Sequence, residues 1–87
     1  MSNWVRNTED EQSDQIVLSF KNSETREGKY IAELSDGTFS VQYWPDLSKD
    51  IETVSLLGSG DTKEEAARVL AEHLSGYTEE ELVALVD

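Results

Sequence analysis

His73 is the single histidine of the chain, and few groups near it in sequence could work with it chemically. Acid–base catalysis, nucleophile activation and zinc ligation each need further groups beside a histidine, and Glu72 is the one obvious neighbour. The chain has no cysteine, which fits a reducing compartment. We interpret His73 as a surface residue near a helix C-terminus, where its charged form is favoured. We therefore expect no catalytic residues and no enzyme activity.

Acidic and hydroxyl residues alternate between Asp46 and Glu52, as do the first ligands of an EF-hand calcium loop. The pattern fails at the two positions that matter most. Ile51 replaces the glycine of the sharp turn, and Leu57 replaces the bidentate glutamate. We interpret the stretch as a solvated acidic loop, and we expect no metal site and no cofactor.

Gly58-Ser59-Gly60 precedes an expected helix, as glycine-rich phosphate-binding loops do. The third glycine of a dinucleotide-binding fingerprint is replaced by Lys63. Asp61 and two glutamates crowd the entrance to the helix and would repel phosphate. We interpret the glycines as a flexible break between a strand and a capped helix.

Nineteen acidic and seven basic residues give the chain a formal net charge of −12. Such a surface repels phosphate backbones, so we expect no direct nucleic-acid binding. Three interpretations stay open: adaptation to a salt-tolerant host, recognition of a basic protein such as a nucleic-acid enzyme, and, as a special case of the second, mimicry of nucleic acid. No apolar run approaches the ~20 residues of a membrane span. We expect a soluble cytoplasmic protein with no membrane association.

The pattern of apolar residues predicts a single α+β domain over residues 15–87. A flexible acidic tail is expected over residues 1–14, with Trp4 and Val5 as its apolar anchors. The predicted fold is an antiparallel sheet of three to four strands with two C-terminal helices packed on one face. The strands are expected near residues 15–20, 29–34, 38–44 and 51–57, and the helices near 63–75 and 79–86.

Asp36-Gly37 is a preferred pair for a two-residue type I′ hairpin loop. That loop places Ser35 opposite Thr38 and fixes the register of both flanking strands. One face of the hairpin is then apolar and buried, and it carries Leu34, Phe39, Tyr30 and Tyr43. The other face carries Ile31 and Trp44, which are predicted to form a partner-binding surface or to be covered by the tail or a helix.

Both helices begin with a capping pattern, a threonine followed three residues later by a glutamate. The pairs are Thr62 with Glu65 and Thr78 with Glu81. Gly76 follows the first helix, where a left-handed cap is common. The residues expected to face the core are Ala66, Ala67, Val69, Leu70 and Leu74 on the first helix and Leu82, Leu85 and Val86 on the second.

Two short motifs between Gly37 and Leu74 resemble the HicB family of antitoxins. They are Tyr43-Trp44-Pro45-Asp46-Leu47 and Gly60-Asp61-Thr62-Lys63-Glu64-Glu65-Ala66. The resemblance implies a partial ribonuclease-H-like β-β-β-α domain that binds and blocks a small, basic, RNA-cleaving toxin. It carries over no functional residue, because the matching positions look structural.

We therefore expect a non-catalytic protein-binding module of the antitoxin or inhibitor type, whose acidic surface masks a basic partner protein. The alternatives are a salt-adapted accessory protein with no inhibitory role and a phage-type mimic of nucleic acid. An exposed strand edge in so small a sheet also allows a homodimer. The candidate partner-binding residues are Ile31, Trp44, Asp46, Asp50, Glu52, Glu64 and Glu72.

Overall fold

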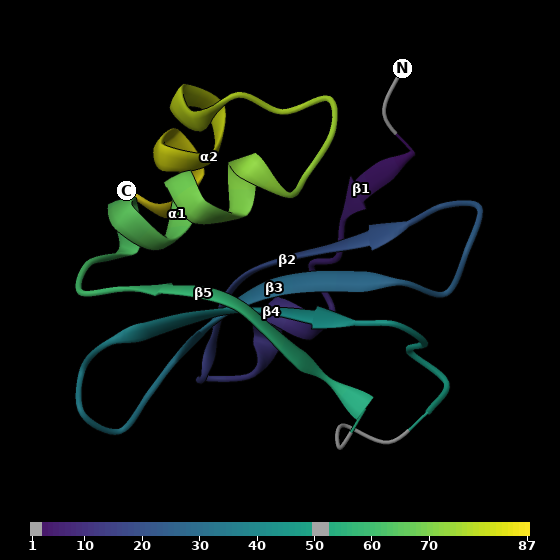
Figure 1. Ribbon diagram of the computed structural model, residues 1–87, viewed down its shortest axis with the longest axis horizontal. Coiled ribbons are helices and arrows are strands. Elements are labelled where there is room, and N and C mark those ends of the chain that lie inside the picture. The colour runs from purple at the N-terminus through teal and green to yellow at the C-terminus, as the bar shows by residue number, and fades with distance from the viewer. Residues whose placement is uncertain (1–2, 50–52) are drawn as a thin grey trace.

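The computed structural model describes residues 3–49 and 53–87, which form a five-stranded antiparallel sheet with two helices on one face. The strands follow one another in sequence order across the sheet (Figure 1). The α+β class and the C-terminal helices are confirmed, and the sheet has more strands than predicted. The elements are β1 (Trp4–Arg6), a 3-10 turn η1 (Asp10–Gln12), β2 (Ile16–Asn22), β3 (Gly28–Glu33), β4 (Phe39–Trp44), β5 (Ser55–Gly60), α1 (Lys63–Glu72) and α2 (Glu79–Val86).

The N-terminal segment is part of the sheet, and the prediction of a separate tail over residues 1–14 is corrected for its described part. β1 pairs with β2, with Val5 opposite Lys21. The Trp4 side chain is only 8% exposed and belongs to the hydrophobic core. The Tyr77 hydroxyl donates to the Trp4 carbonyl at 3.1 Å. A buried tryptophan removes a large apolar area from water, which is enough to hold a three-residue strand in place.

The hairpin between β3 and β4 forms as predicted, but with a different turn. The Leu34 N–H donates to the Thr38 carbonyl at 2.8 Å, and the Gly37 N–H donates to the Leu34 carbonyl at 3.0 Å. Gly37 has φ +86°, whereas Asp36 has no positive φ. A type I′ turn needs positive φ at both residues, so this is a three-residue loop with glycine in the left-handed position. The Asp36 carboxylate instead accepts from the Thr38 N–H and hydroxyl at 3.0 and 2.6 Å.

The extra loop residue shifts the register by one position and corrects the predicted faces. Ile31 lies opposite Val41, and both side chains are fully buried beneath the helices. Tyr30 pairs with Gln42 and therefore points to the opposite side of the sheet from Phe39. Leu34, expected in the core, is 42% exposed. A shift of one residue moves every side chain of a strand to the opposite face of the sheet. The error of one residue in the turn therefore made the predicted faces wrong.

β5 begins later than predicted and continues through the glycines that were expected to break it. It spans Ser55–Gly60 instead of residues 51–57, and the part of the prediction that falls on residues 51–52 lies outside the described residues. The glycines allow α1 to pack closely on the strand. A Cβ atom at Gly58 would lie 2.6 Å from Val69 Cγ1, and one at Gly60 would lie 2.8 Å from the backbone nitrogen of Ala66.

The helix caps form as the threonine and glutamate pairs predict. Thr78 and Glu81 make a complete capping box, with bonds of 3.1 and 3.2 Å. Thr62 accepts from the Glu65 N–H at 3.2 Å. α2 has the predicted bounds, and α1 ends earlier than predicted, at Glu72. Gly76 has φ +88°, the left-handed conformation expected of it, but the C-cap of α1 is His73, so Gly76 lies in the turn beyond the helix and is not its cap.

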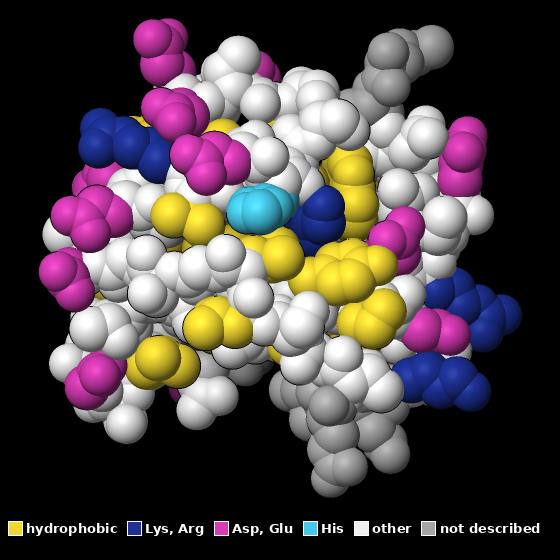
Figure 2. All heavy atoms as spheres, in the orientation of Figure 1, with side chains coloured by type: hydrophobic (Ala, Val, Ile, Leu, Met, Phe, Trp, Pro, Cys, Tyr) yellow, Lys and Arg dark blue, Asp and Glu magenta, His cyan; other side chains and the backbone are white. Residues whose placement is uncertain are grey.

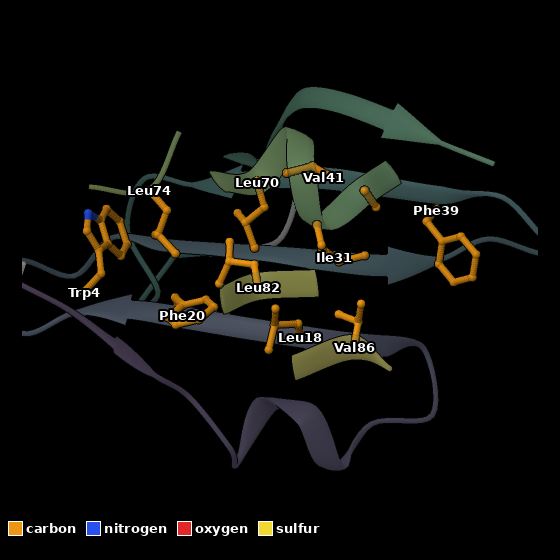
Figure 3. Packing of buried hydrophobic residues seen from close by; sticks show 12 residues of the cluster. Trp4, Leu18, Phe20, Ile31, Phe39, Val41, Leu70, Leu74, Leu82 and Val86 are labelled. Atoms are coloured by element: carbon orange, nitrogen blue, oxygen red, sulfur yellow. The ribbon is translucent and has the colours of Figure 1, made fainter. Parts of the chain in front are cut away.

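The core lies between the sheet and the two helices. Figure 3 shows Leu18, Phe20 and Ile31 of the strands gathered around Leu82 of α2. Of the eight helix residues expected to face the core, Val69 is partly buried and Leu85 is 38% exposed. The other six are buried: Ala66, Ala67, Leu70, Leu74, Leu82 and Val86. None of the helices in the described part of the chain is long and apolar enough to span a membrane.

Candidate partner-binding surface

The seven predicted partner-binding residues do not form one site. Ile31 is fully buried in the core and cannot contact a partner. Trp44 and Asp46 lie together at the end of β4, both partly exposed. Glu64 and Glu72 lie near opposite ends of α1, in the helical layer. The remaining two, Asp50 and Glu52, lie outside the described residues.

The Asp46 carboxylate stabilises its own turn. It accepts from the Ser48 N–H at 2.9 Å and from the Ser48 hydroxyl at 2.6 Å. These hydrogen bonds, the hydroxyl's first, lower the pKa of Asp46. Leu47 folds back over Gly28, where a Cβ atom would lie 2.8 Å from Leu47 Cδ2. The residues of the Trp-Pro-Asp-Leu motif therefore have a structural part in the connection after β4. Among the described residues, no group of three or more His, Cys, Asp or Glu side chains could hold a metal ion.

On the side of the sheet away from the helices, here called the outer face, the described residues place η1 over the half that contains β2. Over β2, the Ser19 hydroxyl donates to Asp10 of η1 at 2.9 Å. Over β3 and β4, the Tyr30 hydroxyl donates to the side-chain amide oxygen Oε1 of Gln42, and Gln42 Nε2 donates to the Ser40 hydroxyl at 2.9 Å. Burial, and then the charge of Asp10, raise the pKa of Tyr30. A hollow of about 380 Å³ lies beside Tyr30 and Gln42 at the hairpin end.

The other half of the outer face carries the most exposed large apolar side chain among the described residues. Leu56 of β5 is 67% exposed and pairs with Gln42, which places it diagonally beside Trp44. The Trp44 ring lies 6.4 Å from the Tyr30 ring, and its Nε1 is buried with no hydrogen-bond partner among the described residues. We call Trp44, Leu56 and the open side of β5 the β5 edge surface.

Sequence reasoning missed Leu56 because the alternation in residues 51–57 has no clean polar face. The register shift between Val41 and Gln42 leaves Leu57 as an extra residue in β5, a bulge that sequence does not reveal. Glu65 was also missed as a surface feature, because its capping role explained it.

Acidic side chains border the β5 edge surface on the helix side. A Cβ atom at Gly60 would lie 2.8 Å from Glu65 Cβ, so Glu65 lies directly over the end of β5. Val69 lies over Gly58 one turn later, and exposed Glu72 follows on the same stripe of α1. We call Asp61, Glu65 and Glu72 the acidic stripe. Figure 2, viewed with β5 in front, shows acidic side chains around the helical layer and a band of apolar atoms between that layer and the sheet.

A second hollow, of about 550 Å³, lies where β1 meets the end of α1. Lys29 Nζ lies 4.7 Å from the Trp4 ring centroid and 5.8 Å from that of Tyr43. It also donates to the backbone carbonyl of His73. Figure 2 shows the histidine beside a basic side chain within the apolar band. Burial lowers the pKa of Lys29, and the nearby Glu27 carboxylate opposes that shift.

The Lys29 ammonium thus satisfies a carbonyl at the C-terminal end of α1, where the helix dipole favours a cation. The two aromatic rings favour the same charge. This geometry explains Lys29 as a structural cation that joins the helix end to the sheet, and it gives His73 the surface position expected for it.

A scan of protein families, a search of curated proteins and a search of solved structures each find no match to this chain. The resemblance to the HicB antitoxins therefore stays a prediction made from the residues alone.

Proposed function

We propose that this protein is a non-catalytic binding module of the inhibitor or antitoxin type, which binds and masks a basic partner protein. The observation that carries the proposal is the 67% exposed Leu56 beside Trp44, on an uncharged strand edge in a chain of net charge −12. An exposed apolar group next to an aromatic side chain is typical of a protein–protein interface. The negative charge around it favours a partner whose surface is positively charged.

The two parts of the surface would contribute differently to binding. The carboxylates attract a basic protein over distance and raise the association rate, whereas Trp44 and Leu56 slow dissociation by excluding water. The same carboxylates repel nucleic acid. A partner that normally acts on nucleic acid has the matching basic surface, and the HicB resemblance points to a small RNA-cleaving enzyme in the cytoplasm.

The alternative is an acidic surface adapted to high salt, with no inhibitory role. One observation favours it: the described residues contain a single salt bridge, from Arg6 to Glu11 at 2.8 Å, so most carboxylates point into solvent without a basic partner. On this alternative, the folded state becomes more stable as salt concentration rises, and no basic protein is retained.

The test is an affinity purification of the tagged protein from its own cells, with washes of rising salt concentration. We expect a basic protein that is retained at low salt and released steeply as salt rises. The retained protein should lose its nuclease activity when the purified chain is added back. The comparison variants are Leu56→Lys, which should abolish retention, and Leu85→Lys on α2, which makes the same change at another exposed leucine and should not. Retention of no basic protein, or equal retention by both variants, would overturn the proposal.

A further inference from the structure

We infer that the partner binds as an added sixth strand, through an extended segment that alternates basic and apolar residues and pairs with the open side of β5. This inference rests on the proposed function and specifies how the basic partner is recognised. The observations that support it are the unpaired edge, the division of the two faces of β5, and the acidic stripe above it.

Among residues 3–49 and 53–87, no strand pairs with the outer edge of β5. The strand order ends at β5, whose other side is hydrogen-bonded to β4 from Phe39 opposite Gly60 to Tyr43 opposite Ser55. Edge strands in natural proteins are commonly protected by charged residues, by proline, by bulges or by very short length. β5 has one of these features, the bulge at Leu57. β5 has six residues, Ser-Leu-Leu-Gly-Ser-Gly, with no charge and no proline. Its open side can therefore accept a further strand, as sheet edges do in peptide recognition.

The two faces of β5 differ in chemistry. Leu56 and Ser59 are paired with Gln42 and Ser40, so both point to the outer face. Gly58 and Gly60 point to α1. The bulge at Leu57 lies between these two pairs and brings Leu56 to the outer side, next to Trp44. An added strand would place every second side chain on this outer side, where an apolar residue covers Leu56.

The intervening side chains of the added strand would point towards the helical layer. There they meet the acidic stripe, since Glu65 lies over Gly60 and Glu72 follows Val69 on the same side of α1. Gly58 and Gly60 add no side chain of their own to this side of β5, where Val69 and Glu65 of α1 lie over them. Lysine or arginine at these alternate positions can reach the carboxylates, so the face of the segment that lies under α1 is basic.

A second copy of this chain fits the same edge poorly. Each copy has a net charge of −12, and β5 itself carries no basic residue. Pairing β5 with its own copy would bring two acidic stripes together, with Arg68 as the one basic residue that neighbours each stripe on α1. Charge complementarity therefore favours a basic segment over a homodimer.

The experiment is a fluorescence anisotropy titration of the whole chain with labelled synthetic peptides long enough to span β5. One peptide alternates lysine with valine and threonine, and its control has the same composition with the lysines in one block. We expect the alternating peptide to bind at least about tenfold more tightly. Amide hydrogen exchange of β5 should slow in the complex at alternate residues, which mere electrostatic attraction would not produce.

Two pairs of variants separate the edge from the general charge. Leu56→Lys should weaken binding of the alternating peptide about tenfold or more, and Leu85→Lys should leave it unchanged. Glu65→Gln with Glu72→Gln should weaken it, whereas Glu79→Gln with Glu80→Gln removes the same charge from α2 and should have a smaller effect. Glutamine at position 65 retains an oxygen for the Asp61 N–H, which Glu65 accepts at 3.0 Å.

Equal affinity for the alternating and block peptides, or no effect of Leu56→Lys, would overturn the strand-addition inference. If the peptide assay gives one of these results but a basic protein is still retained from cells, the proposed function stands without the strand-addition inference. Failure of both assays removes both proposals. A dimer of the chain that Leu56→Lys dissociates, detected by sedimentation, would also overturn the inference, because the edge would then belong to a second copy.

Discussion

The two edges of the sheet are built in contrasting ways. β1 has three residues, and Arg6 at its end is paired with Glu11 of the turn that follows. The Asn7 N–H continues the pairing with a bond of 2.8 Å to the Ser19 carbonyl, and η1 then covers that half of the outer face. β5 has six residues, no charge, and an exposed leucine. One edge is short and charged, with η1 over the adjoining outer face, whereas the other is long, uncharged and unpaired among the described residues. The second is therefore the edge at which we propose strand pairing.

The largest expected effect on stability comes from removing the tryptophan that holds β1, the protected edge. Trp4→Ala deletes a core side chain that is 8% exposed, and it should lower the free energy of unfolding by about 3–5 kcal/mol. Urea denaturation followed by circular dichroism measures the change. Val5→Ala, at the neighbouring position that is 41% exposed, should change stability by no more than about 0.5 kcal/mol. Equal effects of the two variants would mean that β1 is not held by its tryptophan.

A smaller effect tests the close packing that distinguishes the open edge. Gly60→Ala places a Cβ atom 2.8 Å from the backbone nitrogen of Ala66, so α1 must move away from β5. We expect a loss of about 1–3 kcal/mol in the free energy of unfolding. Ser59→Ala alters the preceding residue, whose side chain faces the outer side, and should leave the free energy of unfolding nearly unchanged. A neutral Gly60→Ala would contradict the close contact between α1 and β5.

The smallest effect concerns the outer face that η1 covers. Burial and the Asp10 charge raise the pKa of Tyr30 above 10.0, its ordinary value, so the folded state holds this proton more tightly than the unfolded state. The resulting stability is present below pH 10.0 and is lost as pH rises through the folded pKa. Unfolding measured across this range should show a shallower alkaline loss for Tyr30→Phe than for the unmodified protein. An equal slope of unfolding free energy against pH in both proteins would show that Tyr30 ionises as readily in the folded state as in the unfolded state.

The helices could be predicted from sequence because their signals are local. Thr62 with Glu65, and Thr78 with Glu81, fix each start within four residues, and Gly76 has the left-handed conformation that its position indicated. The hairpin register could not be predicted, because Asp36-Gly37 is compatible with two loops that differ by one residue. That single residue decided whether Ile31 or Tyr30 faces the core.

The candidate surface was predicted in part. Trp44 of the β5 edge surface and Glu72 of the acidic stripe were among the predicted residues, and Pro45 indicated that Trp44 ends its strand. Asp46 was also predicted, but its carboxylate stabilises its own turn. The outward orientation of Leu56 depends on a bulge and on the packing of α1 over glycines, and these tertiary effects could not be predicted from sequence. β1 was missed because a strand of three residues has no periodicity to detect.

The bond from the Tyr77 hydroxyl to the Trp4 carbonyl joins residues 73 positions apart. During synthesis on the ribosome, β1 therefore lacks this contact until Tyr77 has been added to the chain. The central hairpin, whose partners are close in sequence, can form well before that moment. β1 thus precedes β3 and β4 in the chain but gains this contact after they can pair, and a nascent chain halted before Tyr77 would lack it.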